Sequence, residues 1–367
     1  MISIYVRNSV LSPSGYYRVE QYAKSMGRKH RVNNYTPSQI YRLCLKYKTK
    51  RFVIIFQALC FFIGYFRTLF FLLKDCATKP DAIIISREIS PRFLPCSLYF
   101  LLTQISKHSK IFWDFDDDIL LQREISKKEF QLLSAKSTKI IVVNQYLVKL
   151  IPEEHRHKAL LMPTTDGSIP NCDLEKAIVK REKTLNDIVT ILWLGTAVNL
   201  YHLEKILPAL DKAAQRLQTI QNKKLQLRIV SSDFPSYMPH SLDIIKVNWS
   251  RQVAMHEQIA AHIGIMPLVD DEYSKGKGGF KLVQYMAVGL PVIASAVGYN
   301  NEIVRPSFGL LINDINDNEA WIKAIENLTS DAGKYAELCY NARKEWETNF
   351  SFNRNLSIWQ NILENKQ

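Results

Sequence analysis

The sequence lacks the motifs that mark several common classes of enzyme and metalloprotein. Its six cysteines are scattered and form no CxxC pair, which argues against a disulfide framework or a cysteine-based zinc site and for a reducing compartment. The eight histidines contain no HExxH motif and no cluster with metal-ligand spacing. A Gly-x-Ser-x-Gly elbow and a Walker lysine loop are also missing, so hydrolase and P-loop hypotheses lose support.

The chain also contains no internal repeat and no low-complexity tract. Its 367 residues, 47% of them hydrophobic, are enough for two domains with full cores. Short apolar runs such as AIIIS and KIIVVN alternate with helical stretches, which predicts doubly wound α/β domains with parallel sheets. The expected strands cover residues 2–6, 82–86, 110–114 and 139–144, then 189–195, 225–232, 243–248, 263–268, 291–295 and 309–312.

The strand series breaks between Met162 and Asp187, where a stretch rich in proline and polar residues is followed by a charged run. We therefore expect a domain at 1–165, a linker at 166–186 and a second domain at 187–345. The tail, 346–367, is predicted to be a helix that packs back onto another surface, with the first domain as a candidate. The start of the chain, MISIYVRNS, alternates like a strand and shows no cleavable signal.

The segment 276–295, GKGGFKLVQYMAVGLPVIAS, is the most informative stretch of the chain. It predicts a glycine-rich loop, a helix over 280–288 that ends at Gly289, and a strand that Pro291 opens. A helix that starts after such a loop directs N–H groups and a positive dipole at a ligand, which suits a diphosphate. The loop residues are Lys275, Gly276, Lys277, Gly278, Gly279, Phe280 and Lys281. An ordinary loop–helix–strand connection is the alternative.

Other strand ends of the second domain should converge on the same edge of its sheet, where doubly wound proteins bind ligands. These strand ends and loops contribute Gly195, Thr196, Asn199, Ser231, Trp249 and Asp271. We expect Trp249 or a nearby backbone group to face a base, Lys275 or Lys281 to face phosphates, and Gln284 to bond a ribose. A tryptophan in the core is the alternative interpretation of Trp249.

The first domain has its own polar strand ends. After the first strand, Gly15 is expected to turn the chain into a helix, with Tyr16, Tyr17 and Arg18 at the mouth of the sheet. Glu88 ends another strand, and the run WDFDDD places four aspartates within five residues. The electrostatic repulsion among these carboxylates must be compensated. Capping of a helix, a role in orienting a substrate or a bound metal ion would each explain how. We favour capping of the next helix by residues 116–118, together with substrate orientation by Asp116 and Asp117.

Positive charge is concentrated at the start of the chain. Residues 1–80 hold fourteen Lys and Arg but two acids, so they carry +12 of the total +13. Within them, a basic run leads into FVIIFQALCFFIGYFRTLFFLL, residues 52–73. Its length would allow a transmembrane helix, but Gln57, Arg67 and Thr68 interrupt it. We therefore favour a helix that lies in the interface of an anionic membrane through Lys46–Leu73, over a core helix, a spanning helix or a nucleic-acid site.

Taken together, these segments resemble the GT-B glycosyltransferases, and specifically the retaining family 4 group that extends bacterial surface polysaccharides. The resemblance is carried by SGYYRVEQY, REISP, FWDFDDDI, IVVNQYLVKLI and ILWLGTAVNLYHLEKI, and most specifically by residues 263–304. It implies two Rossmann-like domains facing a cleft, a nucleotide-sugar donor, a lipid-linked saccharide acceptor and no required metal or other cofactor. It further implies a peripheral enzyme on the cytoplasmic face of the membrane.

The resemblance implies roles for particular residues and departs from the family at two of them. Lys275 and Lys281 would stabilise the leaving diphosphate, and Asp116 would orient the acceptor. The family's two glutamates, eight positions apart, are replaced here by Gly276 and Gln284. Gln284 is able to hydrogen-bond a ribose but not to act as a carboxylate. The contact that the first of these glutamates makes to the donor sugar would instead be made by Asp271, Glu272 or backbone N–H groups of residues 277–280.

Three other hypotheses make different predictions. A metal-dependent GT-A transferase using Asp114 and Asp116 predicts a single sheet domain and sensitivity to EDTA. A nucleotide-sugar epimerase of GT-B shape would need no acceptor and no membrane patch. A basic scaffold that binds membrane or nucleic acid through residues 1–80 would leave the glycine loop without a ligand.

Overall fold

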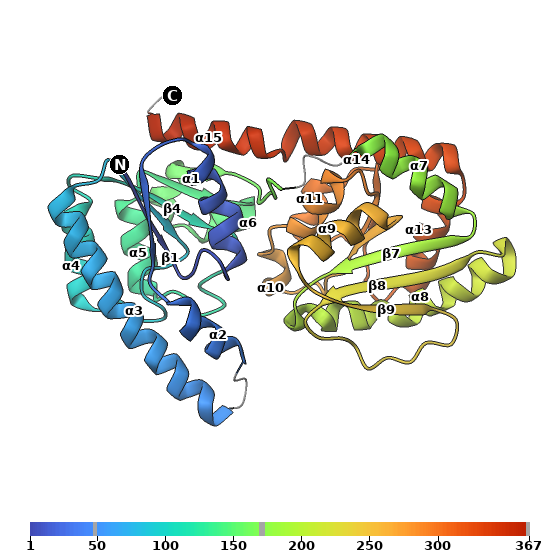
Figure 1. The fold of residues 1–367 in the computed structure, drawn as a ribbon, viewed down its shortest axis with the longest axis horizontal. Helices are drawn as coiled ribbons and strands as arrows, with labels where there is room; N and C mark the ends of the chain where they lie inside the picture. Colours follow the sequence, from blue (N-terminus) through green and yellow to red (C-terminus); the bar gives the residue numbers. More distant parts are fainter. Residues whose placement is uncertain (47–49, 169–172, 365–367) are drawn as a thin grey trace. The chain divides into compact units, whose positions relative to one another are not determined.

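The strands of the described chain all run parallel to their neighbours and form two separate six-stranded sheets (Figure 1). The computed structural model describes residues 1–46, 50–168 and 173–364. The chain divides into unit 1, which is Met1–Thr164, Gly276–Gly278 and Phe352–Gln367, and unit 2, which is Thr165–Lys275 and Gly279–Ser351. The predicted fold class is confirmed, and the two sheets contradict the single sheet domain expected of a GT-A transferase.

The sheet of unit 1 has the order β2-β1-β3-β4-β5-β6. Its strands are β1 (Ile2–Val6), β2 (His30–Asn34), β3 (Ala82–Ser86), β4 (Lys110–Phe115), β5 (Lys139–Val142) and β6 (Ala159–Leu161). β2 and β6 were not predicted from the sequence, and both are edge strands. β2 is polar because Asn33 donates to Ser3 (2.8 Å) on β1 and Arg31 pairs with the buried Asp75, so no apolar run marks it.

Two layers of helices cover this sheet. On one face, the core joins the sheet to α3 (Lys50–Thr78), α4 (Cys96–Ile105), α5 (Lys127–Lys136) and α6 (Gln145–Leu150). On the other face lie η1 (Gly15–Glu20), α1 (Gln21–Ser25) and α15 (Phe352–Glu364). Trp359 of α15 is fully buried there, and Phe352 stacks on Tyr22 with ring centroids 4.9 Å apart. The last helix of the chain therefore packs on unit 1. The remaining short elements are α2 (Ser38–Lys46) and η2 (Glu153–Lys158).

The predicted membrane segment lies within the 29-residue helix α3. Within the described residues, none of the helices combines the length and apolarity needed to cross a membrane. Lys48 of the basic run and the side chains of residues 44–56 lie outside the described part of the structure.

The sheet of unit 2 has the order β12-β11-β10-β7-β8-β9. Its strands are β7 (Ile188–Leu194), β8 (Lys224–Ser231), β9 (Asp243–Asn248), β10 (Ile263–Met266), β11 (Val292–Ser295) and β12 (Gly309–Ile312). All six were expected from the sequence, with ends that differ by one or two residues. They were recognisable because most of them are apolar runs buried on both faces, as in β7 and β11.

Helices also cover both faces of this sheet. One core contains α8 (Leu200–Gln221) and α13 (Asn318–Thr329), and the other contains α9 (Arg251–Ala260), α11 (Phe280–Ala287) and α14 (Ala332–Asn349). The short elements are η3 (Ala197–Asn199), α10 (Glu272–Lys275) and α12 (Asn300–Ile303).

Part of the predicted linker is helical, as α7 (Leu174–Leu185). Asp173 caps this helix by accepting a hydrogen bond from the Lys176 backbone N–H (3.1 Å), and Ile178 and Leu185 join the core of unit 2. The charged run in this stretch is thus mainly the outer face of an amphipathic helix. The linker residues 169–172 lie outside the described chain.

A buried histidine, His262, sits where α7 meets the sheet of unit 2. Its Nδ1 accepts a hydrogen bond from the Thr190 backbone N–H (2.9 Å), and its Nε2 lies 3.0 Å from the Arg181 carbonyl oxygen. This pairing needs the neutral ring with its proton on Nε2. Burial lowers the pKa of His262 to about 4.

The unfolding free energy should therefore fall as the pH drops. Below about pH 6.5 the unfolded chain binds a proton at His262, while the folded chain binds it only near pH 4. Between pH 7 and pH 5, wild type should lose about 2 kcal/mol more than His262→Asn in urea unfolding. His240→Asn, which alters an exposed histidine, should follow wild type. Equal pH dependence in all three proteins would contradict the prediction.

Candidate functional site

The order of the strands identifies the place in unit 2 where a ligand is expected. The chain builds β7, β8 and β9 in one direction and then returns to place β10 on the other side of β7. Ligands of doubly wound sheets bind beyond the carboxyl ends of the strands at such a reversal. The candidate site is therefore the region beyond the ends of β7 and β10.

The helix α11 is held over this point by one buried side chain, Tyr285. Its hydroxyl accepts a hydrogen bond from the Leu194 N–H at the end of β7 (3.0 Å) and lies 3.5 Å from the Ile265 carbonyl of β10. Burial raises the pKa of the Tyr285 hydroxyl, so it keeps its proton. Tyr285 thus fixes the helix that follows the glycine loop against both strands of the reversal.

The start of α11 requires glycine for a steric reason. Gly279 has φ +63°, a left-handed conformation, and an added Cβ would lie 2.3 Å from Ile303 Cδ1. The predicted loop–helix–strand order is present, with α11 over residues 280–287, Gly289 at φ +60° and β11 from Val292. Of the other loop positions, Gly276, Lys277 and Gly278 group with unit 1.

The two lysines proposed for phosphates have different surroundings. Lys281, in the first turn of α11, holds its Nζ 5.7 Å from the ring centroid of Trp193 on β7. Gly195 permits this packing, because an added Cβ there would lie 2.2 Å from the same ring. Lys275 instead pairs with Glu272 (2.9 Å) and lies 3.7 Å from Asp270. Lys281 is therefore the lysine that unit 2 places beside the end of β7.

The remaining predicted donor residues of unit 2 have mostly local partners. Thr196 accepts a hydrogen bond from Asn199 (2.9 Å) in the loop after β7, and Asp271 caps α10 through the Ser274 N–H (2.7 Å). Ser231 is buried at the end of β8. Phe280 opens α11 and is half-buried.

Trp249 and Gln284 are the two predicted donor residues whose surroundings bear most on a ligand. Trp249 follows β9 and is 55% exposed, so the core interpretation of this residue is wrong. Gln284 directs its amide at the buried Asp166, at 3.5 Å.

His202 lies at the same edge and was not among the predicted residues. It is buried in the first turn of α8, and its Nδ1 accepts a hydrogen bond from the Val269 N–H beyond β10 (3.0 Å). Its ring lies on that of Tyr201, with centroids 3.8 Å apart. The only sequence signal was its position shortly after the end of a strand. His202 joins the segments that follow β7 and β10.

In unit 1, a set of ion pairs occupies the corresponding edge, where β1 and β3 lie on either side of the reversal. Arg87 lies at its centre, just after β3. Its guanidinium donates to Asp116 (2.9 Å), to Glu124 (2.8 Å) and to Asp117. Burial opposes the charge of Asp116, but Arg87, Arg18 and a hydrogen bond from Ser14 outweigh it and lower its pKa.

Two of the predicted acceptor residues are fully buried. Arg18 donates three hydrogen bonds to Asp114 (2.7, 3.0 and 3.0 Å) and others to Thr164 and the Met162 carbonyl. Glu88 accepts from Arg7 (3.0 Å) and from the Tyr35 hydroxyl (2.6 Å). Both side chains act on neighbouring protein groups, so they position the strand ends.

The first turn of η1 consists of Gly15, Tyr16 and Tyr17. An added Cβ at Gly15 would lie 2.3 Å from Val6 Cγ2, so glycine is needed for η1 to pack on β1. Tyr17 is buried and Tyr16 is half-buried, with their rings edge to face at 5.1 Å. Of this pair, Tyr16 is the more accessible.

Arginines offset the repulsion of the four aspartates, with Arg18 on Asp114 and Arg87 on Asp116 and Asp117. Asp118 accepts from the Leu121 N–H (2.8 Å) and caps only a turn, whereas the next helix, α5, is capped by Ser126. Capping of that helix by the aspartates is therefore wrong. Among the described residues, no group of three His, Cys, Asp or Glu side chains is placed to hold a metal ion.

Part of unit 2 matches a family of known proteins. Residues 189–331 match the family described as Glycosyl transferases group 1. A segment of 76 residues is 36% identical to D-inositol 3-phosphate glycosyltransferase of Salinispora tropica, and it covers 21% of this chain and 16% of that relative. Residues 189–331 therefore form a group 1 glycosyltransferase domain.

Solved structures of low sequence identity share the fold of the whole chain. Sucrose-phosphate synthase from Thermosynechococcus elongatus superposes with a TM-score of 0.66 at 13% identity, over 99% of this chain and 98% of that chain. Anabaena HepE in complex with UDP-glucose gives 0.67 at 11% identity, over 99% of both chains. A glycosyltransferase from Rickettsia africae gives 0.63 at 15%, over 99% and 97%. The chain has the GT-B fold.

Removing Arg87 should destabilise unit 1, because Asp116, Asp117 and Glu124 would then face one another. We expect Arg87→Met to cost about 3 kcal/mol at pH 7. Without the cation the carboxyl pKa values rise, so the deficit relative to wild type should shrink as the pH falls towards 4. Urea unfolding at both pH values measures this change.

Arg92→Met is the matched control, since Arg92 is also left-handed (φ +66°) but bonds the neutral Gln57. It should change stability by less than about 0.5 kcal/mol. A pH-independent deficit in Arg87→Met would show that the guanidinium does not act by neutralising these carboxylates.

Proposed function

Because residues 189–331 form a group 1 glycosyltransferase domain on a GT-B fold, we propose that the chain transfers a sugar from a nucleotide-diphosphate sugar to an acceptor, with retention of configuration. One observation carries the proposal: the N-terminus of α11 lies at the strand reversal of unit 2. Gly279 and Tyr285 fix it in that position. A helix N-terminus with a lysine in its first turn suits a diphosphate.

The donor would lie along the edge of the unit 2 sheet that is formed by the carboxyl ends of its strands. Its diphosphate faces the start of α11 and Lys281, and its base faces the exposed ring of Trp249. HepE, solved with UDP-glucose, supports a nucleotide-sugar ligand for this fold. Gln284 offers the ribose an amide, whereas Lys275 is held by its acidic neighbours and takes a lesser part.

The proposed reaction needs no nucleophile on the enzyme. The bond from the sugar C1 to the diphosphate breaks, and the acceptor oxygen bonds C1 on the same face. The acceptor proton leaves on a phosphate oxygen. Positioning and stabilisation of the departing diphosphate supply the catalysis. Proton NMR of the product linkage tests retention, and an inverted anomer would overturn it.

Asp116 is the proposed acceptor-orienting group, in unit 1. Its lowered pKa keeps it an ionised, weak base, which suits acceptance of a hydrogen bond from a sugar hydroxyl rather than removal of its proton. Asp117 is 31% exposed and stands beside it on the same arginine. The acceptor proposed is a lipid-linked saccharide in the assembly of a cell-surface polysaccharide.

We also propose that unit 1 rests on the cytoplasmic face of an anionic membrane through α3. The inner face of this helix combines apolar and polar contacts, because Leu72 is buried in the core of unit 1. Toward the same unit, Arg67 donates to the Asn34 carbonyl (3.0 Å), and Thr68 donates to the Ile89 carbonyl (3.2 Å). Gln57 accepts from Arg92 (3.1 Å), so all three polar residues that interrupt the apolar segment bond to unit 1. The outward face is left to apolar side chains.

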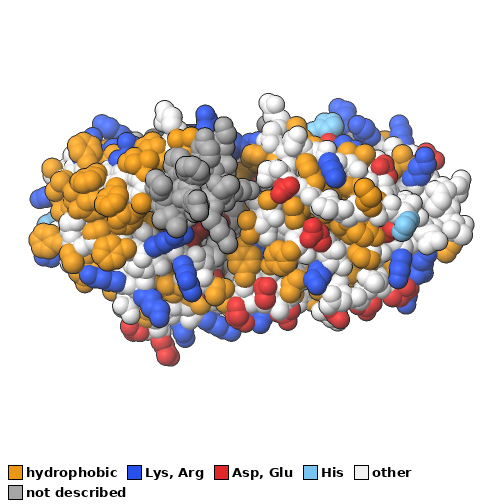
Figure 2. Space-filling view, turned by 90° about the horizontal axis from the view of Figure 1, so that it is seen from below, with side chains coloured by type: hydrophobic (Ala, Val, Ile, Leu, Met, Phe, Trp, Pro, Cys, Tyr) orange, Lys and Arg blue, Asp and Glu red, His pale blue; other side chains and the backbone are white. Residues whose placement is uncertain are grey.

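That outward face is a stripe of exposed side chains at helical spacing, here called the aromatic stripe. Phe62, Phe66 and Phe70 are each about 60% exposed. The stripe and its neighbours on the β3–α4 loop and α4 comprise Leu59, Phe62, Phe66, Phe70, Leu73, Phe93 and Phe100. Figure 2 shows hydrophobic side chains gathered at the α3 and α4 end, with Lys and Arg around them. An apolar face rimmed by cations suits an anionic membrane interface.

For the donor site, we expect calorimetry to detect binding of one of UDP, GDP or dTDP, or of its sugar, with no effect of EDTA. Lys281→Ala should weaken that binding about tenfold, since one charge-assisted phosphate contact contributes about 1.5 kcal/mol. Lys212→Ala, an exposed lysine on α8, is the control and should bind like wild type.

Two outcomes of that titration would count against the donor site. Binding that requires a divalent metal would move the nucleotide to the aspartates of unit 1. If none of the nucleotides binds, the donor-site assignment is wrong, and the hypothesis of a basic, non-enzymatic scaffold is favoured.

For the membrane contact, we expect wild type to sediment with vesicles of one part phosphatidylglycerol to three parts phosphatidylcholine. Replacing Phe62, Phe66 and Phe70 by serine should lower the partition coefficient at least about 100-fold, at roughly 1 kcal/mol for each half-buried ring. The matched control replaces Val198, Ile220 and Met238, exposed apolar residues of unit 2. Wild type that ignores these vesicles in 0.1 M salt would contradict the contact.

A further inference from the structure

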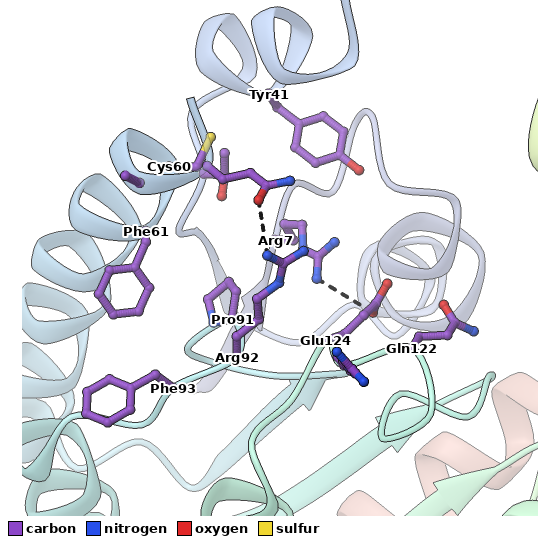
Figure 3. Close-up of a pocket in the computed structure, with 13 residues that line it drawn as sticks. Arg7, Tyr41, Cys60, Phe61, Pro91, Arg92, Phe93, Gln122 and Glu124 are labelled. Carbon is purple, nitrogen blue, oxygen red and sulfur yellow. Dashed lines mark hydrogen bonds and ion pairs between the residues drawn. The ribbon is translucent and has the colours of Figure 1, made fainter. Parts of the chain in front are cut away.

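A cavity of about 650 Å³ lies in unit 1 beside the aromatic stripe, and neither the donor site nor the ion-pair set accounts for it. Figure 3 shows its lining: α2 and α3 on one side, and the loops that follow β1, β3 and β4 on the other. Its volume is in the range of cavities that hold a ligand of several hundred daltons. The cavity therefore has room for a sizeable part of a substrate.

One wall of the cavity is apolar and continues onto the surface proposed to meet the membrane. Phe61 of α3 and Phe93 of the β3–α4 loop approach with ring centroids 6.4 Å apart. Phe93 is 61% exposed, and the ring of Phe61 lies 5.8 Å from that of Phe62 on the aromatic stripe. An apolar chain could thus pass from a membrane into the cavity without crossing polar surface.

The cavity also carries an excess of positive charge. Its lining holds three arginines, Arg7, Arg92 and Arg123, and one acid, Glu124. Arg7 is already paired with Glu88 and lies 3.6 Å from Glu124. Among the described side chains, Arg92 bonds only the neutral Gln57, and Arg123 is exposed and makes no ion pair with the described acids. Two guanidinium groups are therefore left to attract an anion.

The backbone holds these two arginines in an unusual conformation. Arg92 has φ +66° and Arg123 has φ +54°, values that side-chain-bearing residues rarely adopt. The two loops are joined by a hydrogen bond from the Arg92 N–H to the Glu124 carbonyl (2.8 Å). Strained residues that the surrounding structure holds in place are concentrated at ligand sites.

We propose that this cavity binds a phosphate-headed amphiphile, with its phosphate on Arg92 and Arg123 and its apolar chain along Phe61 and Phe93. Guanidinium forks match the oxygens of a phosphate, and the aromatic wall matches the adjoining chain. The inference rests on the membrane contact and the acceptor class proposed above. It assigns the cavity to the lipid end of the acceptor, and membrane phospholipid is the other source of the same chemistry.

The test is a titration of the full chain with farnesyl monophosphate below its micellar concentration. Wild type should bind it saturably and more tightly than it binds inorganic phosphate or farnesol, which carry only one of the two features. The variant Arg92→Asn/Arg123→Asn should bind at least tenfold more weakly. Asparagine tolerates the left-handed backbone, so this variant removes the charge and keeps the loops.

Lys79→Asn is the matched control, because Lys79 is an exposed, left-handed cation (φ +46°) outside the cavity. It should bind like wild type, and thermal melting should show all proteins folded. Equal weakening in this control, or equal affinity of wild type for inorganic phosphate or farnesol, would overturn the proposal. A Phe93→Ser variant should lose affinity for farnesyl phosphate but not for inorganic phosphate, and unchanged affinity would overturn the apolar half.

Two further measurements separate the possible sources and the possible failures. Dihexanoyl-phosphatidylglycerol that competes as well as farnesyl phosphate would support a membrane phospholipid, and weak competition would support the acceptor lipid. Nucleotide and vesicle binding are measured on the same samples. If both persist without farnesyl phosphate binding, only the cavity assignment fails, and if all three are absent, the proposed function fails with it.

Discussion

The pairing of buried arginines with strand-end carboxylates is the interaction on which the organisation of unit 1 depends. Four aspartates lie within five residues at the end of β4, Asp114 in the strand and three just after it, and in a desolvated setting they would repel one another strongly. Arg18 neutralises Asp114, and Arg87 neutralises Asp116 and Asp117, from two other segments of the chain. These pairs tie the first loop, the end of β3 and the β4 loop into one edge, which also forms one side of the cavity.

The helix α3 is apolar on its inner face and on its outer face. Leu69 and Leu72 pack on the core of unit 1, and Arg67 bonds to the same unit, while the aromatic stripe faces outward. Water makes such a surface unfavourable, so the arrangement is consistent with a partner that is itself apolar. The same helix supplies Phe61 to the cavity, so one element serves the proposed membrane contact and the proposed lipid site.

The sequence predicted the fold where burial alone decides it, and it failed where partners distant in the chain decide it. Runs such as those of β3 and β7 are apolar throughout because both faces are covered, so they were recognised. β2 was missed because its side chains bond Ser3 and Asp75, which are not adjacent in sequence. For the same reason, the aspartate run predicted helix capping, whereas arginines far away in the chain neutralise it. The glycine loop and α11 were predictable because glycine, lysine and helix signals are local.

Both units have a parallel sheet with one strand reversal, which follows the second strand in unit 1 and the third strand in unit 2. The electrostatic environments at the two reversals are opposite. In unit 2, β7 ends in Gly195 and Thr196, and the nearby charged group is Lys281, so the edge favours an anion. In unit 1, Glu88 and its partners Arg7 and Tyr35 fill the corresponding position, and Glu88 is fully buried. Because these side chains fill the space at the reversal, a ligand of unit 1 would have to bind to one side of it. That side is where the Arg87 network presents Asp116 and where the cavity joins the aromatic stripe. The charge pairing inside unit 1 thus limits where the proposed acceptor is able to lie.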